Sequence, residues 1–243
     1  MLVFFDIFGS ALSHESLSST MARTMCLATA LLLASAAGLP RQALLDAIKP
    51  LDRGFRATSD ERKRVAGLIT TLASTAPALS AEGLGGEWEL LWSDAPDIVG
   101  SSFGTITGAG GLSSPFADAA RIGQSIDAAA GTIANVIEYR PPAWLASAAP
   151  GLASDRLQQR VLLAYTTSGT RCELTVRGAV VAPRMALGVS LLALPPLTLQ
   201  GDLSLPFGSF EVLYNDGELR AVRTKQGYFG VNRRLPDGQS WDE

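Results

Sequence analysis

The chain has 243 residues, of which 47% are apolar and 18% charged, and its formal net charge is −3. This composition is typical of a globular protein with a core of ordinary size and excludes a disordered chain. The overall acidity gives no basic footprint for nucleic acid, so we expect no nucleic-acid partner.

The first 38 residues are predicted to form a leader that is removed from the mature protein. A basic start at Met21 precedes an apolar run from Met25 to Leu33 and the small residues Ala34-Ser35-Ala36, which is the order of a signal-type leader. The run is too short to span a bilayer, and a buried N-terminal helix is the alternative. We therefore expect one folded domain over residues 39–243.

The folded part contains few residues that could carry catalysis. The one histidine, His14, and one of the two cysteines, Cys26, lie in the leader, which leaves Cys172 alone. Without histidine, neither a serine–histidine nor a cysteine–histidine nucleophile can form. One thiol allows no internal disulfide and no cysteine-ligated zinc. Phosphate-loop, dinucleotide and metal motifs are absent from the sequence, so we expect no cofactor and no metal.

Two helices are predicted before the first strand. The segment from Arg41 to Lys49 is amphipathic and ends at Pro50. A second helix begins after Thr58, where Thr58 and Glu61 have the spacing of a capping box, and Pro77 ends it. Its apolar stripe has helical spacing and consists of Val65, Leu68, Ile69 and Leu72.

After Gly86 the apolar period changes from helical to two, which predicts strands. Trp88, Leu90 and Trp92 are expected on one face of the first strand. Residues 94–120 are rich in Gly and Ser and predict a long loop that is mobile or functional. Asn215-Asp216-Gly217 is the strongest hairpin signal. Further strands are predicted over Thr132–Tyr139, Leu157–Thr167, Arg171–Val181, Gly208–Tyr214, Glu218–Arg223 and Tyr228–Arg234.

Residues 185–207 depart from this pattern because they contain one charge, Asp202, and three prolines, Pro195, Pro196 and Pro206. The prolines exclude a continuous helix or a central strand. Such a stretch either packs over the mouth of a barrel or lies exposed as a patch for lipid or a partner, and the two roles are compatible. Short strands joined by turns after a helical pair predict a mainly β fold, either a sandwich or a closed barrel.

Several segments, in chain order, resemble the plastid lipid-associated protein family, also called PAP/fibrillin. In its middle block an aromatic residue often stands at the position of Gly123. The resemblance covers roughly residues 41–234. Its segments are Leu44–Ile48, Asp52-Arg53-Gly54, Gly86–Ile98, Arg121–Asp127, Leu194–Leu197, Asp216–Arg223, Gly227 and Phe229–Val231.

The resemblance implies a lipocalin-like antiparallel β-barrel in the chloroplast or another plastid, on thylakoids or plastoglobules. It implies an apolar lipid ligand of the carotenoid, quinone or fatty-acid class, and a peripheral membrane or lipid-globule surface as partner. It does not imply an agreed catalytic mechanism.

A lipid carrier needs an apolar cavity with a few polar anchors. Since Arg220 and Arg223 face opposite sides of a regular strand, at most one points inward unless a bulge intervenes. An inward arginine could hold a carboxylate or a polar head. The alternative for an inward arginine is an ion pair with Asp216, Glu218 or Glu211. The other candidates also have purely structural alternatives. The strand residues from Trp88 to Trp92 could fill the core, Asp216 could form the turn, and the Tyr214 hydroxyl could bond to backbone. The candidate ligand-binding residues are Trp88, Leu90, Trp92, Tyr214, Asp216, Arg220 and Arg223.

Three functions remain open at this point. The first is a lipid carrier, and the second is a structural coat protein that adsorbs to lipid globules through the apolar stretch. The third is an isoprenoid- or lipid-modifying enzyme, which would need an inward carboxylate or tyrosine with a shifted pKa. No catalytic constellation is visible, so we expect no enzyme. The candidates for that chemistry are Glu87, Glu89, Glu138, Glu173 and Tyr165.

Overall fold

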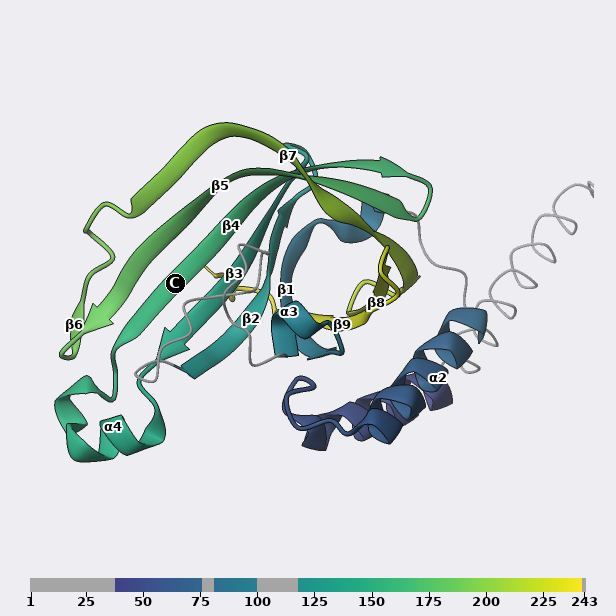
Figure 1. Cartoon of the computed structure of the whole chain (residues 1–243), viewed down its shortest axis with the longest axis horizontal. Coiled ribbons are helices and arrows are strands. Elements are labelled where there is room, and N and C mark those ends of the chain that lie inside the picture. The colour runs from purple at the N-terminus through teal and green to yellow at the C-terminus, as the bar shows by residue number, and fades with distance from the viewer. Residues whose placement is uncertain (1–37, 76–80, 100–117, 242–243) are drawn as a thin grey trace, which may run out of the picture.

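Eight antiparallel strands close into a barrel (Figure 1). The computed structural model describes residues 38–75, 81–99 and 118–241. Round the barrel the order is β4-β3-β2-β1-β9-β8-β7-β5, β5 pairs again with β4, and a short β6 is attached to β5. The strands are β1 (Gly86–Ser93), β2 (Asp118–Asp127), β3 (Thr132–Arg140), β4 (Arg156–Ser168), β5 (Arg171–Ala186), β6 (Val189–Ser190), β7 (Leu197–Asn215), β8 (Leu219–Thr224) and β9 (Phe229–Arg234).

This architecture confirms the predicted mainly β fold with N-terminal helices and a lipocalin-like antiparallel barrel. The six later predicted strands are all present. The expected leader, except residue 38, lies outside the described residues, as do Pro77 and most of the predicted loop over 94–120. The short elements between strands are η2 (Ala81–Leu84), α3 (Pro96–Val99), α4 (Ala143–Ala148) and η3 (Pro150–Leu152).

Two strands differ from the sequence prediction. β2 was not predicted, because small and polar residues such as Gly123 and Gln124 hide its alternation. β7 begins at Leu197 and not at Gly208, and so it runs through Pro206. Pro206 lies beside a register shift against β5, before β7 meets β8 at Phe210. A proline is tolerated at such an edge position because no ladder hydrogen bond depends on its nitrogen.

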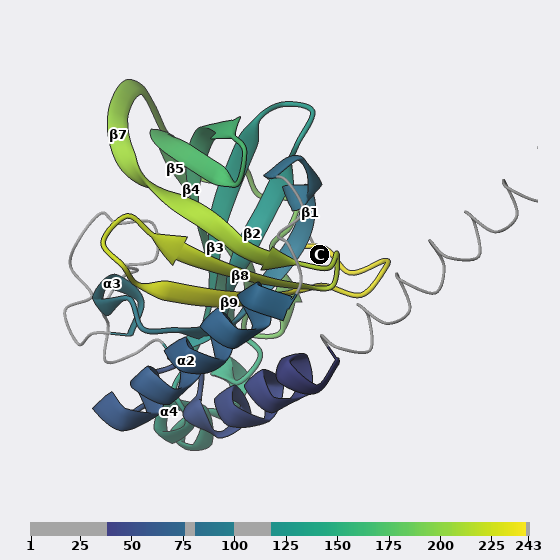
Figure 2. The same ribbon diagram turned by 90° about the vertical axis from the view of Figure 1, so that its right-hand side faces the viewer.

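The N-terminal helices cover one side of the barrel (Figure 2). Residues 38–48 are helical and continue into η1 (Lys49–Leu51), and α2 spans Ser59–Thr75. The predicted capping box is present: Glu61 N–H donates to Thr58 Oγ1 at 3.3 Å, and Thr58 N–H donates to Glu61 Oε2 at 2.8 Å. The bond from Thr58 N–H and a second from the Thr58 hydroxyl to the same carboxylate hold the pKa of Glu61 below its usual value.

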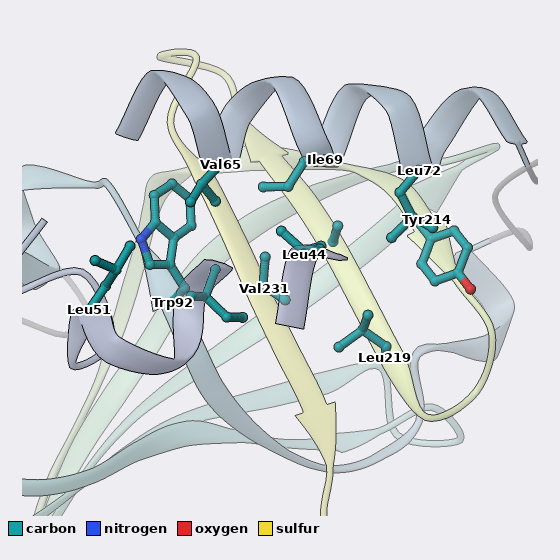
Figure 3. Close-up of a cluster of buried hydrophobic side chains, with 11 residues drawn as sticks. Leu44, Leu51, Val65, Ile69, Leu72, Trp92, Tyr214, Leu219 and Val231 are labelled. Atoms are coloured by element: carbon teal, nitrogen blue, oxygen red, sulfur yellow. The ribbon is translucent and has the colours of Figure 1, made fainter. Parts of the chain in front are cut away.

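The helices pack on the outer face of β7, β8, β9 and β1. Figure 3 shows the apolar cluster between the two layers, in which Val65, Ile69 and Leu72 of α2 lie over side chains of the sheet. The predicted helical stripe is therefore the buried face of α2. The buried members of the cluster are Leu44, Ile48, Leu51, Val65, Ile69, Leu72, Trp92, Tyr214, Leu219, Ala221 and Val231.

The C-terminal segment covers a second patch of the outer surface. Trp241 is fully buried in a cluster with Val136 and Leu235. Its carbonyl oxygen accepts hydrogen bonds from Gln158 Nε2 at 2.6 Å and Arg160 Nη2 at 2.9 Å. The Trp241 ring stands where a side chain on residue 123 would have to lie. The tail thus supplies an aromatic ring beside Gly123.

None of the helices in the described ranges has both the length and the apolar character needed to cross a membrane.

We expect Gly123→Ala to lower the free energy of unfolding by about 1–3 kcal/mol, because the new methyl group overlaps the Trp241 ring and the Trp88 carbonyl oxygen. The measurement is urea denaturation followed by tryptophan fluorescence. Gly67→Ala is the matched control: it adds the same methyl group in α2, where nothing lies within 4 Å. The control should gain about 0.5–1 kcal/mol. Equal effects of the two substitutions would contradict the proposed packing of the tail.

Candidate functional site

A β-bulge in β1 decides which of its large side chains enter the barrel. The register against β9 shifts between Leu90 and Trp92. Trp88 packs in an interior cluster with Cys172 and Val212, whereas Trp92 packs under the helices. The prediction that Trp88, Leu90 and Trp92 share one face is therefore wrong, because the extra residue of the bulge reverses the alternation after Leu90.

A register shift has the same effect in β7, where the pairing with β8 shifts between Val212 and Tyr214. Phe210 and Val212 belong to the interior cluster, whereas Tyr214 points to the helices (Figure 3). The Tyr214 hydroxyl donates to Asp216 Oδ2 at 2.8 Å, and burial, followed by this bond, raises the pKa of Tyr214. Two residues expected near a ligand, Trp92 and Tyr214, thus lie outside the barrel interior.

Asp216 joins the β7–β8 turn to the N-terminal helix. Its Oδ1 accepts from the backbone N–H groups of Glu218 at 2.9 Å and Leu219 at 2.6 Å. Its Oδ2 lies 3.0 Å from Arg41 Nε. This is the turn-forming role that the sequence left open for Asp216, with an added contact to the helical layer.

A cavity of about 420 Å³ lies inside the barrel, within the size range of small-ligand sites. One end is formed by α3 and the residues around the β8–β9 turn. The other end stops at a layer of polar side chains. The apolar walls include Leu90, Ile98, Ile122, Leu174, Phe210, Val222 and Tyr228, and the polar side chains include Gln124, Asn135, Ser209 and Asn232.

Three amides form the polar end of the cavity. Gln124 Nε2 donates to Asn135 Oδ1 at 2.9 Å, and Asn232 lies on β9 opposite Leu90 of β1. None of the three was predicted as a site residue. Their inward position follows from strand register, and β2, which carries Gln124, was itself not predicted as a strand. In the sequence, each of the three is a polar residue at a strand position whose neighbours two residues away point inward. This pattern could have predicted them as site residues.

Arg220 lies directly behind these amides and is fully buried. Its Nη2 donates to Gln124 Oε1, and its guanidinium carbon is 4.5 Å from the centre of the Trp88 ring. The Arg234 guanidinium lies 4.6 Å from the centre of the same ring. Burial, more than the repulsion from Arg234, lowers the pKa of Arg220 to about 9, although Cys172 acts in the opposite direction. This layer closes the inner end of the cavity.

The expectation that at most one of the two β8 arginines points inward is correct. Arg223 lies on the outer face and pairs with Glu211 at 2.9 Å. Among the described residues, Arg220 has no carboxylate within ion-pair distance, and its Nε and Nη1 have no hydrogen-bond acceptor. An ion pair with Glu211 was an alternative considered for an inward arginine. In the structure the outward Arg223 makes that ion pair.

The candidates for enzyme chemistry do not line the cavity. Glu89 pairs with Arg233 at 2.8 Å and Glu138 with Arg121 at 3.6 Å, on the outer face, and Glu173 pairs with Arg171 at 2.6 Å. Glu87 accepts from the Ser125 hydroxyl. Burial raises the pKa of Tyr165, which packs against the interior cluster that holds Trp88.

The described lining of the cavity contains no carboxylate, lysine or histidine. Nor do the described residues bring together three or more His, Cys, Asp or Glu side chains that could hold a metal ion. The arrangement can enclose an apolar molecule and meet a polar group at its inner end.

In the apolar stretch predicted over 185–207, side chains are described for residues 185–199. All of these are exposed except Met185, Ala186 and Leu191, which are half-buried. The stretch forms the far end of the long β5–β7 sheet, beside β6 and away from α2 (Figure 1). We call its large exposed side chains, which are 52–70% accessible, the apolar tip. The apolar tip consists of Leu187, Val189, Leu192, Leu194, Leu197 and Leu199.

The PAP_fibrillin family model matches residues 39–231, about four-fifths of the chain. No curated protein matches the chain, and no solved structure does.

We expect Tyr214→Phe to lower the free energy of unfolding by about 1 kcal/mol, because it removes the hydroxyl bond to Asp216. Lipid binding should not change, since Tyr214 lies outside the cavity. Thermal and urea denaturation measure the first effect. The control, Tyr228→Phe, removes a hydroxyl at the cavity and should leave stability within about 0.5 kcal/mol. Lost lipid binding at unchanged stability in Tyr214→Phe would make Tyr214 a ligand residue.

Proposed function

The chain belongs to the PAP_fibrillin family of plastid lipid-associated proteins, and we propose that it binds an apolar lipid inside its barrel. The observation that carries this proposal is the 420 Å³ cavity with apolar walls and one polar end. A ligand there would lose apolar surface to a preformed site, which is the main source of affinity for such molecules. Carotenoids, quinones and fatty acids are the candidate classes.

Of the residues predicted from the sequence, we propose Leu90 as a wall of the ligand site, and Trp88 and Arg220 as its inner support. Trp92, Tyr214, Asp216 and Arg223 act in the fold. We further propose that residues 1–38 direct the chain to a plastid, where the domain from residue 39 works at thylakoids or plastoglobules. A carrier is favoured over an enzyme because no acid–base pair among the described residues faces the cavity.

The apolar tip supports a second candidate function, a coat protein on lipid globules. Six large aliphatic side chains are more than half exposed there, and residues 185–201 carry no charge. Water contact with so many aliphatic groups in one region is unfavourable, and burial in a lipid surface would remove it. The two functions are compatible, because the tip could hold the protein on a lipid surface while the cavity exchanges lipid.

The first test is mass spectrometry of organic extracts of the full chain after incubation with total plastid lipids. We expect one lipid class in about equimolar amount. Val222→Phe, which fills the cavity, should reduce the recovered lipid about tenfold and leave stability unchanged or higher. Val189→Phe, the same change on the exposed tip, should have no effect on the recovered lipid. Recovery of bulk membrane lipid alone, unaffected by Val222→Phe, would count against a carrier.

The second test concerns the apolar tip. The double variant Leu192→Asp/Leu194→Asp should abolish flotation of the full chain with vesicles of plastid lipid, because the charges oppose insertion. Its control is Thr70→Asp/Thr71→Asp, which adds the same charge on the exposed face of α2 and should float normally. Flotation that survives both pairs of substitutions would rule out the tip as the lipid-contacting surface.

A further inference from the structure

We propose that the cavity selects single-chain lipids with an ionised carboxylate, and that Arg220 and Gln124 hold this head group at the inner end. The inference rests on the proposed function, since it names the ligand of the same cavity. It starts from the charge of Arg220.

Arg220 is a buried cation without a counter-ion. It has 0% exposure, and no described carboxylate lies within ion-pair distance. Its nearest charged neighbour at Trp88 is Arg234, which has the same sign. Cys172 does not supply a negative charge, because burial raises the pKa of its thiol to about 11. A buried charge is costly unless it is paired, so this position favours binding of an anion.

The guanidinium also has unused donors. Nη2 donates to Gln124 Oε1, whereas Nε and Nη1 have no acceptor among the described residues. A guanidinium binds carboxylates through two N–H groups at once, and such charge-assisted bonds are stronger than bonds to a neutral amide. A carboxylate is therefore a better partner for Arg220 than the amide oxygen that it contacts.

Gln124 connects Arg220 to the cavity. Its side chain lines the cavity, accepts from Arg220 and donates to Asn135. A carboxylate that takes the place of Gln124 Oε1 would meet the guanidinium. The displaced amide, with Asn232 beside it, would then supply further N–H donors to the head group.

The orientation of the ligand follows from this arrangement. The head group lies at the polar end, and the hydrocarbon chain runs along Leu90, Phe210 and Val222 towards α3. A pure hydrocarbon or an ester would leave Arg220 without an anion and would place apolar groups against the amides. A ligand without an anionic group would leave these buried polar groups of the site unpaired. The free-energy cost of the unpaired groups lowers the affinity for such a ligand.

The competing explanation is that Arg220 only supports the fold by stacking on Trp88. The near-isosteric substitution Gln124→Glu distinguishes this explanation from the anion site, because it gives Arg220 a carboxylate from the protein itself. If the cation lacks an anion, Gln124→Glu raises the melting temperature of the lipid-free protein and removes the preference for acids. If Arg220 is satisfied by stacking, the new charge gains nothing and ligand preference stays.

The experiment measures binding of palmitate and methyl palmitate to delipidated full-length protein at pH 8, by displacement of a fluorescent apolar probe. Palmitate should bind at least about tenfold more tightly than its ester, a ratio expected for one charge-assisted bidentate contact. Arg220→Met should bring this ratio to about one, and Arg220→Lys should keep part of it. Arg223→Met, which removes an outward arginine of the same strand, should keep the full ratio.

The outcomes separate this inference from the proposed function. Equal binding of palmitate and methyl palmitate to the native chain overturns the inference and leaves a lipid carrier standing. A preference for palmitate that survives Gln124→Glu, with no rise in melting temperature, also overturns it. Binding of neither compound, together with no lipid recovered from plastid extracts, overturns both.

Discussion

The one-residue register shift in β1 is the constraint on which the rest of the structure depends. β1 lies between β2 and β9 in the barrel, and the shift between Leu90 and Trp92 reverses the faces of its side chains. Trp88 and Leu90 are thereby committed to the interior, and Trp92 to the helical layer. A regular strand would place Trp88, Leu90 and Trp92 on one side. Either the barrel interior or the contact with the helices would then lose its tryptophan.

The interior is divided into two parts by this choice. Around Trp88 the barrel is filled, with Cys172, Phe210 and Val212 packed together. Beyond the layer of Arg220 and Gln124 it is open enough for a small molecule. Arg220 and Arg234 lie over the Trp88 ring, and amides separate Arg220 from the cavity. The remaining space therefore has apolar walls and a polar end with a cation behind it. A carrier of amphiphilic lipids needs both features.

The outer surface is divided in a similar way. Helices cover the strands that carry Trp92, Tyr214 and Val231, and the C-terminal segment covers β2 and β3 through Trp241. At the far end of β5 and β7, in contrast, large aliphatic side chains lie in water. Covered faces give the barrel its stability, while the exposed end is the place where contact with a lipid surface would cost least.

The sequence by itself determined the elements whose signals are local. The capping box at Thr58, the turn at Asp216 and most strand bounds follow from short patterns, and ordered motifs pointed to the family. Only the tertiary structure decided which side chains face the cavity. The faces of Trp92 and Tyr214 depend on bulges, and a bulge is defined by the register between two strands that lie far apart in sequence. The partnership of Arg220 with Gln124, 96 residues away, has the same origin, since no local pattern records which residues meet across a closed barrel.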